Sequence, residues 1–120
     1  MRAALIAEEF FETIHAMFPG DGPNDWIDDA EKRVMYGVKV ARIRVSIPEL
    51  ADGMADLDYV VEGTRLEFGI DGAPIAAEVH RANMAKVGGP IAENGKRLKP
   101  PGWTPPDIVS ELRKQGMSDT

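Results

Sequence analysis

The sequence predicts an α+β fold, with helices at both ends and a small antiparallel sheet between them. Two segments near the N-terminus repeat apolar side chains at helical spacing, whereas the middle, residues 38–80, changes to a period of two. Helices and strands are thus segregated along the chain, which favours an α+β domain over a doubly wound parallel sheet. A chain of 120 residues suits a single domain that buries its core without disulfides.

Two helices are expected first, over residues 3–18 and 25–36. The apolar stripe of the first helix consists of Ile6, Phe10, Ile14 and Met17, widened by Phe11 and Phe18. The second helix has apolar residues four apart, begins at a cap formed by Asn24 or Asp25, and ends at Gly37. The wide phenylalanine stripe also offers a face for self-association.

Strands are expected in the middle of the chain. In "VKVARIRVSI", apolar residues alternate with Arg42 and Arg44, which predicts a half-buried strand ended by Pro48. Two more strands are expected in "YVVEG" and "TRLEFGI", and Asp71-Gly72 is typical of a hairpin turn. A return strand to about His80 completes a sheet of three to four strands, although good helix formers leave residues 74–86 open between strand and helix.

A proline-rich basic strap is expected to precede the C-terminal helix. Four prolines stiffen the stretch "GKRLKPPGWTPPDI", and "TPPD" is typical of a helix start, so the last helix is expected over 105–115. We therefore divide the chain into an α+β core, residues 1–94, and a strap with its helix, residues 95–120. The second part either belongs to the same domain or forms a partner-binding tail.

Composition restricts the compartment and the classes of partner. The absence of cysteine excludes disulfides and thiolate metal sites, and the net charge of −6 argues against broad coating of nucleic acid. No apolar run approaches the ~20 residues that span a bilayer, and Glu8, Glu9 and Glu12 interrupt the N-terminal apolar patch. A cytoplasmic protein without membrane partners is expected.

Few residues indicate catalysis. Glu12 and His15 have the spacing used in di-metal helical bundles, but the motif occurs once, and Glu78 and His80 would share one side of a strand. The loop "GGPIAENGKR" lacks the spacing of a phosphate-binding loop. Two acidic clusters do not follow the calcium-loop pattern; they are Asp25, Asp28 and Asp29, and Asp52, Asp56 and Asp58. No catalytic residue, metal or cofactor is predicted.

One basic and aromatic set is the candidate binding surface. It consists of Arg42, Arg44, Lys96, Arg97, Lys99 and Trp103. Such residues could contact an acidic protein, hold the phosphates and bases of a nucleic acid, or simply tie the last helix to its own core.

These observations predict a small non-enzymatic binding or assembly protein. A phage or bacterial accessory component, or the subunit of a homo-oligomer, is the class that fits an acidic chain without a catalytic set. One alternative is a nucleic-acid-binding protein that uses the local basic patch. The other is a small enzyme that uses a Glu/His pair.

Overall fold

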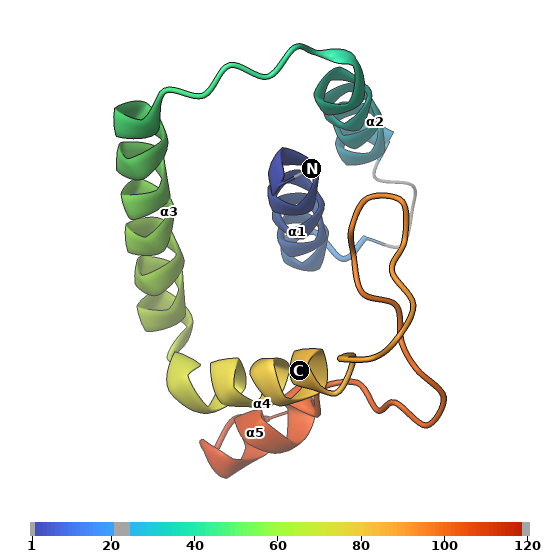
Figure 1. Cartoon of the computed structure of the whole chain (residues 1–120). Helices are drawn as coiled ribbons and strands as arrows, with labels where there is room; N and C mark the ends of the chain where they lie inside the picture. Colours follow the sequence, from blue (N-terminus) through green and yellow to red (C-terminus); the bar gives the residue numbers. More distant parts are fainter. Residues whose placement is uncertain (1, 21–24, 119–120) are drawn as a thin grey trace. The chain divides into compact units, whose positions relative to one another are not determined.

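The structure is a computed structural model, and it describes residues 2–20 and 25–118. Within these ranges the regular elements are five helices (Figure 1): α1 (Arg2–Met17), α2 (Asp25–Val40), α3 (Ile47–Phe68), α4 (Gly72–Met84) and α5 (Ile108–Lys114). The described residues form no sheet, and their one β-type pairing is an isolated bridge between Ile91 and Arg97. The predicted α+β fold is therefore wrong, and the fold is all-helical.

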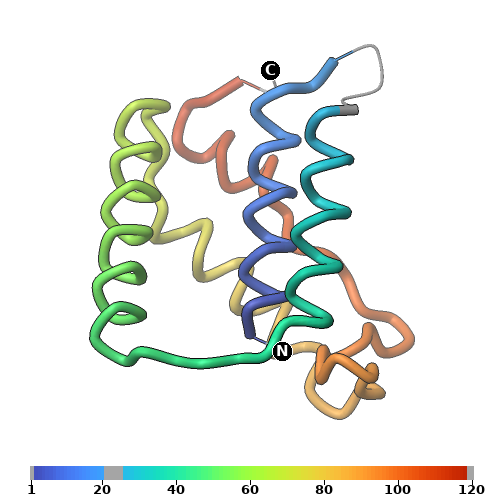
Figure 2. The backbone as a smooth tube through the Cα atoms, turned by 90° about the horizontal axis from the view of Figure 1, so that it is seen from above, coloured from blue at the N-terminus to red at the C-terminus, as the bar shows by residue number. Residues whose placement is uncertain are grey.

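The chain divides into two compact units, Met1–Arg44 and Val45–Thr120. The first unit is a helical hairpin, in which α1 and α2 lie side by side (Figure 2). Phe11 and Ile27 are its buried large side chains, at 6% and 1% exposure. Phe18 and Trp26 meet edge to face near the connection of the two helices. Among the described residues of this hairpin, fully buried large side chains are thus few, and half-buried residues such as Leu5 and Ile14 contribute the rest of the apolar contact.

The strand predicted at residues 38–47 is not formed. Residues up to Val40 complete α2, and an irregular segment then carries Arg42 and Arg44, both exposed, to the start of α3. The alternation of apolar and basic residues is real, but a strand also needs a neighbouring strand for its hydrogen bonds. Pro48 does not end a strand. It lies in the first turn of α3, where its missing N–H costs no helical hydrogen bond.

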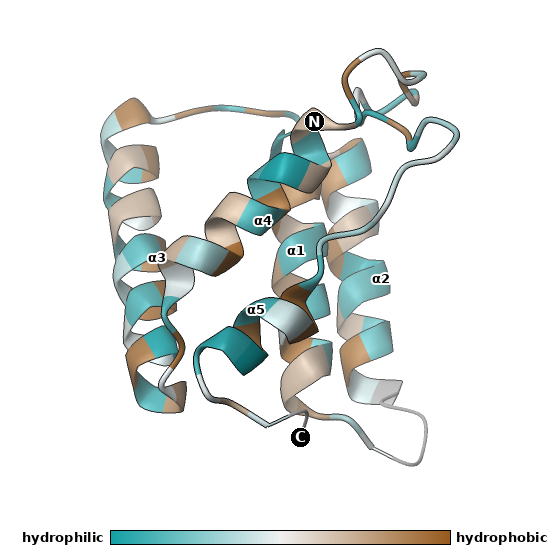
Figure 3. Cartoon of the chain, turned by 90° about the horizontal axis from the view of Figure 1, so that it is seen from below, coloured by the Kyte–Doolittle hydropathy of each residue, from teal (hydrophilic) through white to brown (hydrophobic). Residues whose placement is uncertain are grey.

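The strands predicted in "YVVEG" and "TRLEFGI" are parts of α3. From Ile47 to Val61 apolar residues recur at alternating spacings of three and four: Ile47, Leu50, Met54, Leu57 and Val61. Phe68 follows seven residues later, and Thr64 takes the position between them. This spacing produces a single apolar stripe on a helix. Figure 3 shows apolar residues recurring along α3. The period of two at residues 66–70 is too short to compete with 22 residues of helical periodicity.

The predicted Asp71-Gly72 hairpin turn is a boundary between two helices. Gly69 ends α3 with a left-handed φ of 71°, and Asp71 then caps α4 by accepting a hydrogen bond from the Ala73 N–H at 3.2 Å. The sequence leaves residues 74–86 open between strand and helix, and the structure shows that most of them are helical. The good helix formers there, together with the Asp71 cap, favour α4 over the expected return strand.

The second unit ends with the strap and α5, which packs on α4. The last helix begins at Ile108, later than the expected residue 105, because Asp107 caps it by accepting a hydrogen bond from the Ser110 N–H at 3.0 Å. Pro105 and Pro106 stay outside the helix. Among the described residues, none of the helices combines the length and apolar character needed to cross a membrane.

Candidate functional site

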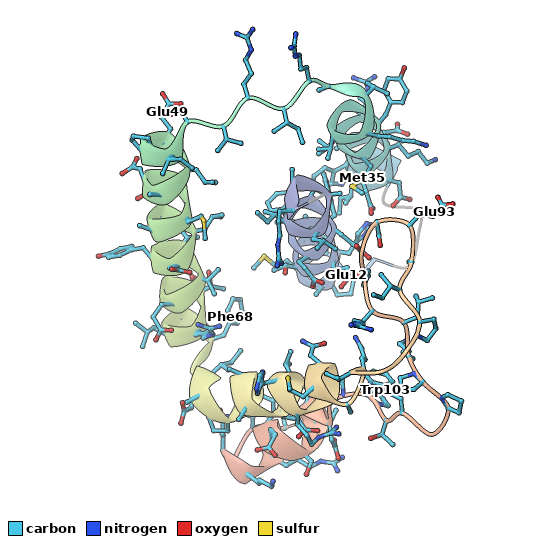
Figure 4. The ribbon with its side chains drawn as sticks, viewed as in Figure 1. Glu12, Met35, Glu49, Phe68, Glu93 and Trp103 are labelled. Carbon is cyan, nitrogen blue, oxygen red and sulfur yellow. The ribbon has the colours of Figure 1, made fainter. Side chains whose placement is uncertain are left out.

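A row of carboxylates follows one face of α3. Glu49, Asp52 and Asp56 are spaced three and four residues apart, so their side chains succeed one another over two turns. All three residues are exposed, and Figure 4 shows the Glu49 side chain at the start of the helix. Within the described part of the chain none of the three has an ion pair or side-chain hydrogen bond. The row therefore offers several oxygen ligands that no neighbouring cation neutralises.

A second group of acids lies on α1. Glu8, Glu9 and Glu12 fall within two turns, and Figure 4 shows Glu12 on this helix. His15 follows one turn after Glu12 but faces α2, where its Nε2 lies 3.4 Å from Asp28 Oδ1 and 3.5 Å from Glu31 Oε2. The Glu12–His15 spacing thus does not create a ligand pair by itself, and the contacts of His15 come from the other helix.

The predicted pairing of Glu78 with His80 does not occur. On a helix, residues two apart point to different faces, and Glu78 instead accepts two hydrogen bonds from Arg81, at 2.9 and 2.8 Å. Its Oε1 also accepts from the Asp107 N–H at 3.0 Å. The Arg81 hydrogen bonds, followed by the one from Asp107, lower the pKa of Glu78 to about 2. Glu78 thus connects α4 to the cap of α5, and His80 stays exposed.

Trp103 makes a hydrogen bond and two cation–π contacts within its own chain. The indole N–H donates to the Ala82 carbonyl at 2.7 Å, and the amines of Lys86 and Lys99 lie 5.0 and 5.1 Å from the ring centroid. Figure 4 places Trp103 near the C-terminal end of α4. These contacts favour the strap among the three interpretations of the basic set.

The cations of the set differ in their surroundings. Arg97 donates to the Gly89 carbonyl at 3.1 Å, inside the loop that leads to the strap. Arg42 and Arg44 belong to the first unit, and the remaining members belong to the second. The structure therefore gathers Lys99 and Trp103 within the second unit.

The helices and their carboxylates suit one broad class of protein. A helical chain that carries the row Glu49, Asp52 and Asp56, without ion pairs among the described residues, has the donors that hard divalent cations prefer. Helical proteins with such donors are a class that includes metal-assisted hydrolases.

The comparison with protein families gives the particular assignment. Residues 1–83 match the family of phosphoribosyl-ATP pyrophosphohydrolase, and the chain belongs to this family. The match extends from α1 almost to the end of α4 and stops before the strap. No curated protein matches the chain significantly.

This membership corrects the prediction of a non-enzymatic binding protein, because the family is one of enzymes. The enzyme alternative was the better interpretation, although the Glu/His pair offered for it is not formed. The α3 carboxylates carried the missed signal. The sequence groups Asp52 and Asp56 with Asp58 as an acidic cluster without a calcium-loop pattern, and Glu49 is not part of that cluster. Only a helical assignment of residues 47–68 places the three in one row.

Proposed function

We propose that the chain hydrolyses a phosphoanhydride bond of a nucleoside triphosphate and releases pyrophosphate, with phosphoribosyl-ATP as the first substrate to test. The single observation that supports this activity is the family match over residues 1–83. It covers both helices that carry the acid groups, α1 and α3.

A magnesium ion fits the donors on α3. Mg²⁺ prefers oxygen ligands and is usually held by one or two carboxylates together with waters and substrate phosphates. Glu49 and Asp52 lie one turn apart, are exposed, and have no cationic partner within the described residues, so we assign them as the residues that would hold the ion. A bound Mg²⁺ neutralises phosphate charge and polarises the phosphoryl oxygen.

The chemistry left to the protein is the orientation of phosphates and the removal of a proton from water. The chain has no cysteine, and α3 has no histidine, so carboxylates are the proton acceptors that this helix offers. Asp56 follows Asp52 by one turn on the same face. We propose Asp56 for this second task, because it can accept a proton while the other two carboxylates face the cation.

A direct assay of pyrophosphate release tests the proposal. The purified chain is incubated with Mg²⁺ and phosphoribosyl-ATP or each common nucleoside triphosphate. We expect Asp52→Asn to reduce the rate at least about 100-fold. Glu62→Gln is the matched control, because Glu62 lies on another face of α3 and pairs with Arg65 at 3.1 Å. Absence of turnover with every substrate, or equal rates in Asp52→Asn and the wild type, would refute the proposal.

We also propose that the active protein is a homo-oligomer. Members of the family often form oligomers, and the apolar stripe of α3 has no buried residue. We propose that a second copy covers this stripe, in an assembly located in the cytoplasm. Apolar side chains at alternating spacings of three and four are typical of helices that pack on another helix.

A partner-binding role of the basic set also remains a proposal. Arg42 and Arg44 are its exposed members in the first unit, and their guanidinium groups suit phosphates or an acidic protein surface. The double variant Arg42→Ala/Arg44→Ala tests this role. We expect it to weaken substrate or partner binding without a change in helix content, and unchanged binding would contradict the proposal.

A further inference from the structure

A small polar cluster joins the two helices of the first unit. It consists of His15 on α1 and of Asp28 and Glu31 on α2. Their ligand atoms all lie within 4.8 Å of one another, and the two carboxylates lie one turn apart on α2. The three side chains are partly exposed, at 34%, 49% and 36%.

The distances in this cluster are not those of hydrogen bonds. A protonated imidazole that donates to a carboxylate approaches it to about 2.7–2.9 Å. His15 Nε2 instead lies 3.4 Å from Asp28 and 3.5 Å from Glu31, nearly equidistant from the two oxygens. Within the described residues the His15 side chain has no hydrogen bond. The ring nitrogen therefore shares a space with two oxygens and is bonded to neither.

The two His15 distances, 3.4 and 3.5 Å, match the edge of a tetrahedron around an ion of the size of Zn²⁺. Zn²⁺ bonds to nitrogen and oxygen are about 2.1 Å long, and the edge of a regular tetrahedron is roughly 1.6 times the distance from centre to corner, so neighbouring ligand atoms lie about 3.4 Å apart. An octahedral Mg²⁺ site of similar bond length has adjacent ligands only about 3 Å apart. Ca²⁺ allows longer edges but takes oxygen ligands, and one ligand here is an imidazole nitrogen.

We infer that His15, Asp28 and Glu31 form a binding site for a divalent transition metal of the Zn²⁺ class. The site has three protein ligands from two helices and leaves a fourth position for water. It connects α1 to α2 in a hairpin whose buried large side chains are Phe11 and Ile27. Because a small core supplies limited stability, a metal bridge would add directly to the stability of the hairpin.

Cobalt is the probe, because tetrahedral Co²⁺ has an intense visible absorption that octahedral Co²⁺ lacks. The whole chain is stripped with a chelator and titrated with Co²⁺ and then with Zn²⁺ in a large excess of Mg²⁺, which competes for the proposed α3 carboxylate site, and the metal bound per chain is measured. We expect one equivalent of Co²⁺ with a tetrahedral spectrum, its displacement by Zn²⁺, and a higher melting temperature of the loaded protein. Uptake of no metal, or an octahedral spectrum, would overturn the inference.

Variants locate the metal. His15→Gln and Glu31→Gln should each weaken Co²⁺ binding at least about tenfold, since even residues outside the first coordination sphere contribute tenfold or more. His80→Gln is the matched control, because His80 is exposed on α4 and is not a member of the cluster. Equal affinity of His15→Gln and the wild type would refute the site. Circular dichroism checks the folding of each variant, and if the variants unfold, the stoichiometry and spectrum of the wild type decide.

The inference is independent of the proposed hydrolase activity. Asp52→Asn should leave the Co²⁺ spectrum and stoichiometry unchanged, whereas it should abolish pyrophosphate release. Loss of the cobalt spectrum in Asp52→Asn would instead show that the metal is held by α3, and would contradict the assignment to His15, Asp28 and Glu31.

Discussion

Arg81 lies one turn after Glu78 on α4 and donates two hydrogen bonds to its carboxylate, from Nε at 2.9 Å and from Nη2 at 2.8 Å. The pair also reaches beyond its own helix. Glu78 accepts from the Asp107 N–H, and Arg81 donates to the Pro105 carbonyl at 3.2 Å. The exposed fraction of the Glu78 side chain is only 17%. One ion pair thus holds the start of α5 against α4.

This arrangement predicts an acid-sensitive attachment of α5. The pKa of Glu78 is lowered from 4.5 to about 2 by Arg81 and the Asp107 N–H. A carboxyl group with a depressed folded-state pKa stabilises the fold fully above its unfolded pKa, and this contribution disappears as the pH falls from about 4.5 to about 2. We expect the melting temperature of the wild type to fall more steeply over this window than that of Glu78→Gln.

Thermal unfolding followed by circular dichroism between pH 2 and pH 6 measures the difference. Glu62→Gln is the control, because it removes another i,i+3 carboxylate–arginine pair, whose hydrogen bond stays within α3. Its curve should stay parallel to that of the wild type. If Glu78→Gln also stays parallel to the wild type, the ion pair does not hold α5.

We expect the two tryptophans to contribute unequally to the stability of the fold. Trp103→Phe leaves the Ala82 carbonyl without its donor and removes the best ring for Lys86 and Lys99, so we expect a loss of about 1–2 kcal/mol. Trp26 is 61% exposed, and Trp26→Phe should change stability by no more than about 0.5 kcal/mol. Urea unfolding measures both. Equal effects would show that the strap is not fastened by Trp103.

Gly89 is expected to be indispensable to the loop before the strap. A Cβ atom at this position would collide with the Leu98 carbonyl oxygen, a backbone atom that cannot rotate away. Gly89→Ala should therefore cost about 1–3 kcal/mol. Gly37→Ala is the contrasting substitution, since its Cβ meets nothing within 4 Å and lies inside α2, where it should stabilise by about 0.5–1 kcal/mol. Urea unfolding that ranks the two in the opposite order would contradict this account.

Two local features of the sequence, Pro48 and Asp71-Gly72, mark true boundaries of secondary structure, but the prediction attached them to the wrong kind of element. Each of them also suits a helix start, and the surrounding period decides between the two uses. The first helix was predicted close to its observed bounds because it has an apolar stripe and a Pro-Gly stop of its own. The start of the second helix was predicted correctly, but its predicted end at Gly37 is wrong, since α2 continues through Gly37 to Val40. In the middle, three short alternations outweighed the longer helical repeat of α3.

Because of this error, the candidate site was not recognised in the sequence. Glu49, Asp52 and Asp56 become a row only when residues 47–68 are helical, and the contact of His15 with Asp28 and Glu31 needs two helices packed side by side. Spacing along one helix could identify the first group. Nothing in sequence spacing reveals the second, because its members come from separate elements whose rotation about their axes is set by packing.

The apolar stripe of α3 predicts a substitution that separates assembly from folding. Leu57 lies in the stripe at 50% exposure, whereas Tyr59 lies on another face at 84% exposure. If a second copy covers the stripe, Leu57→Glu places a charge in the interface and should shift the protein to monomers, whereas Tyr59→Glu should not. Light scattering over a concentration series measures the mass, and circular dichroism verifies that both variants keep their helices. A wild type that is monomeric at every concentration, or a Leu57→Glu variant with the mass of the wild type, would refute the assignment of the stripe.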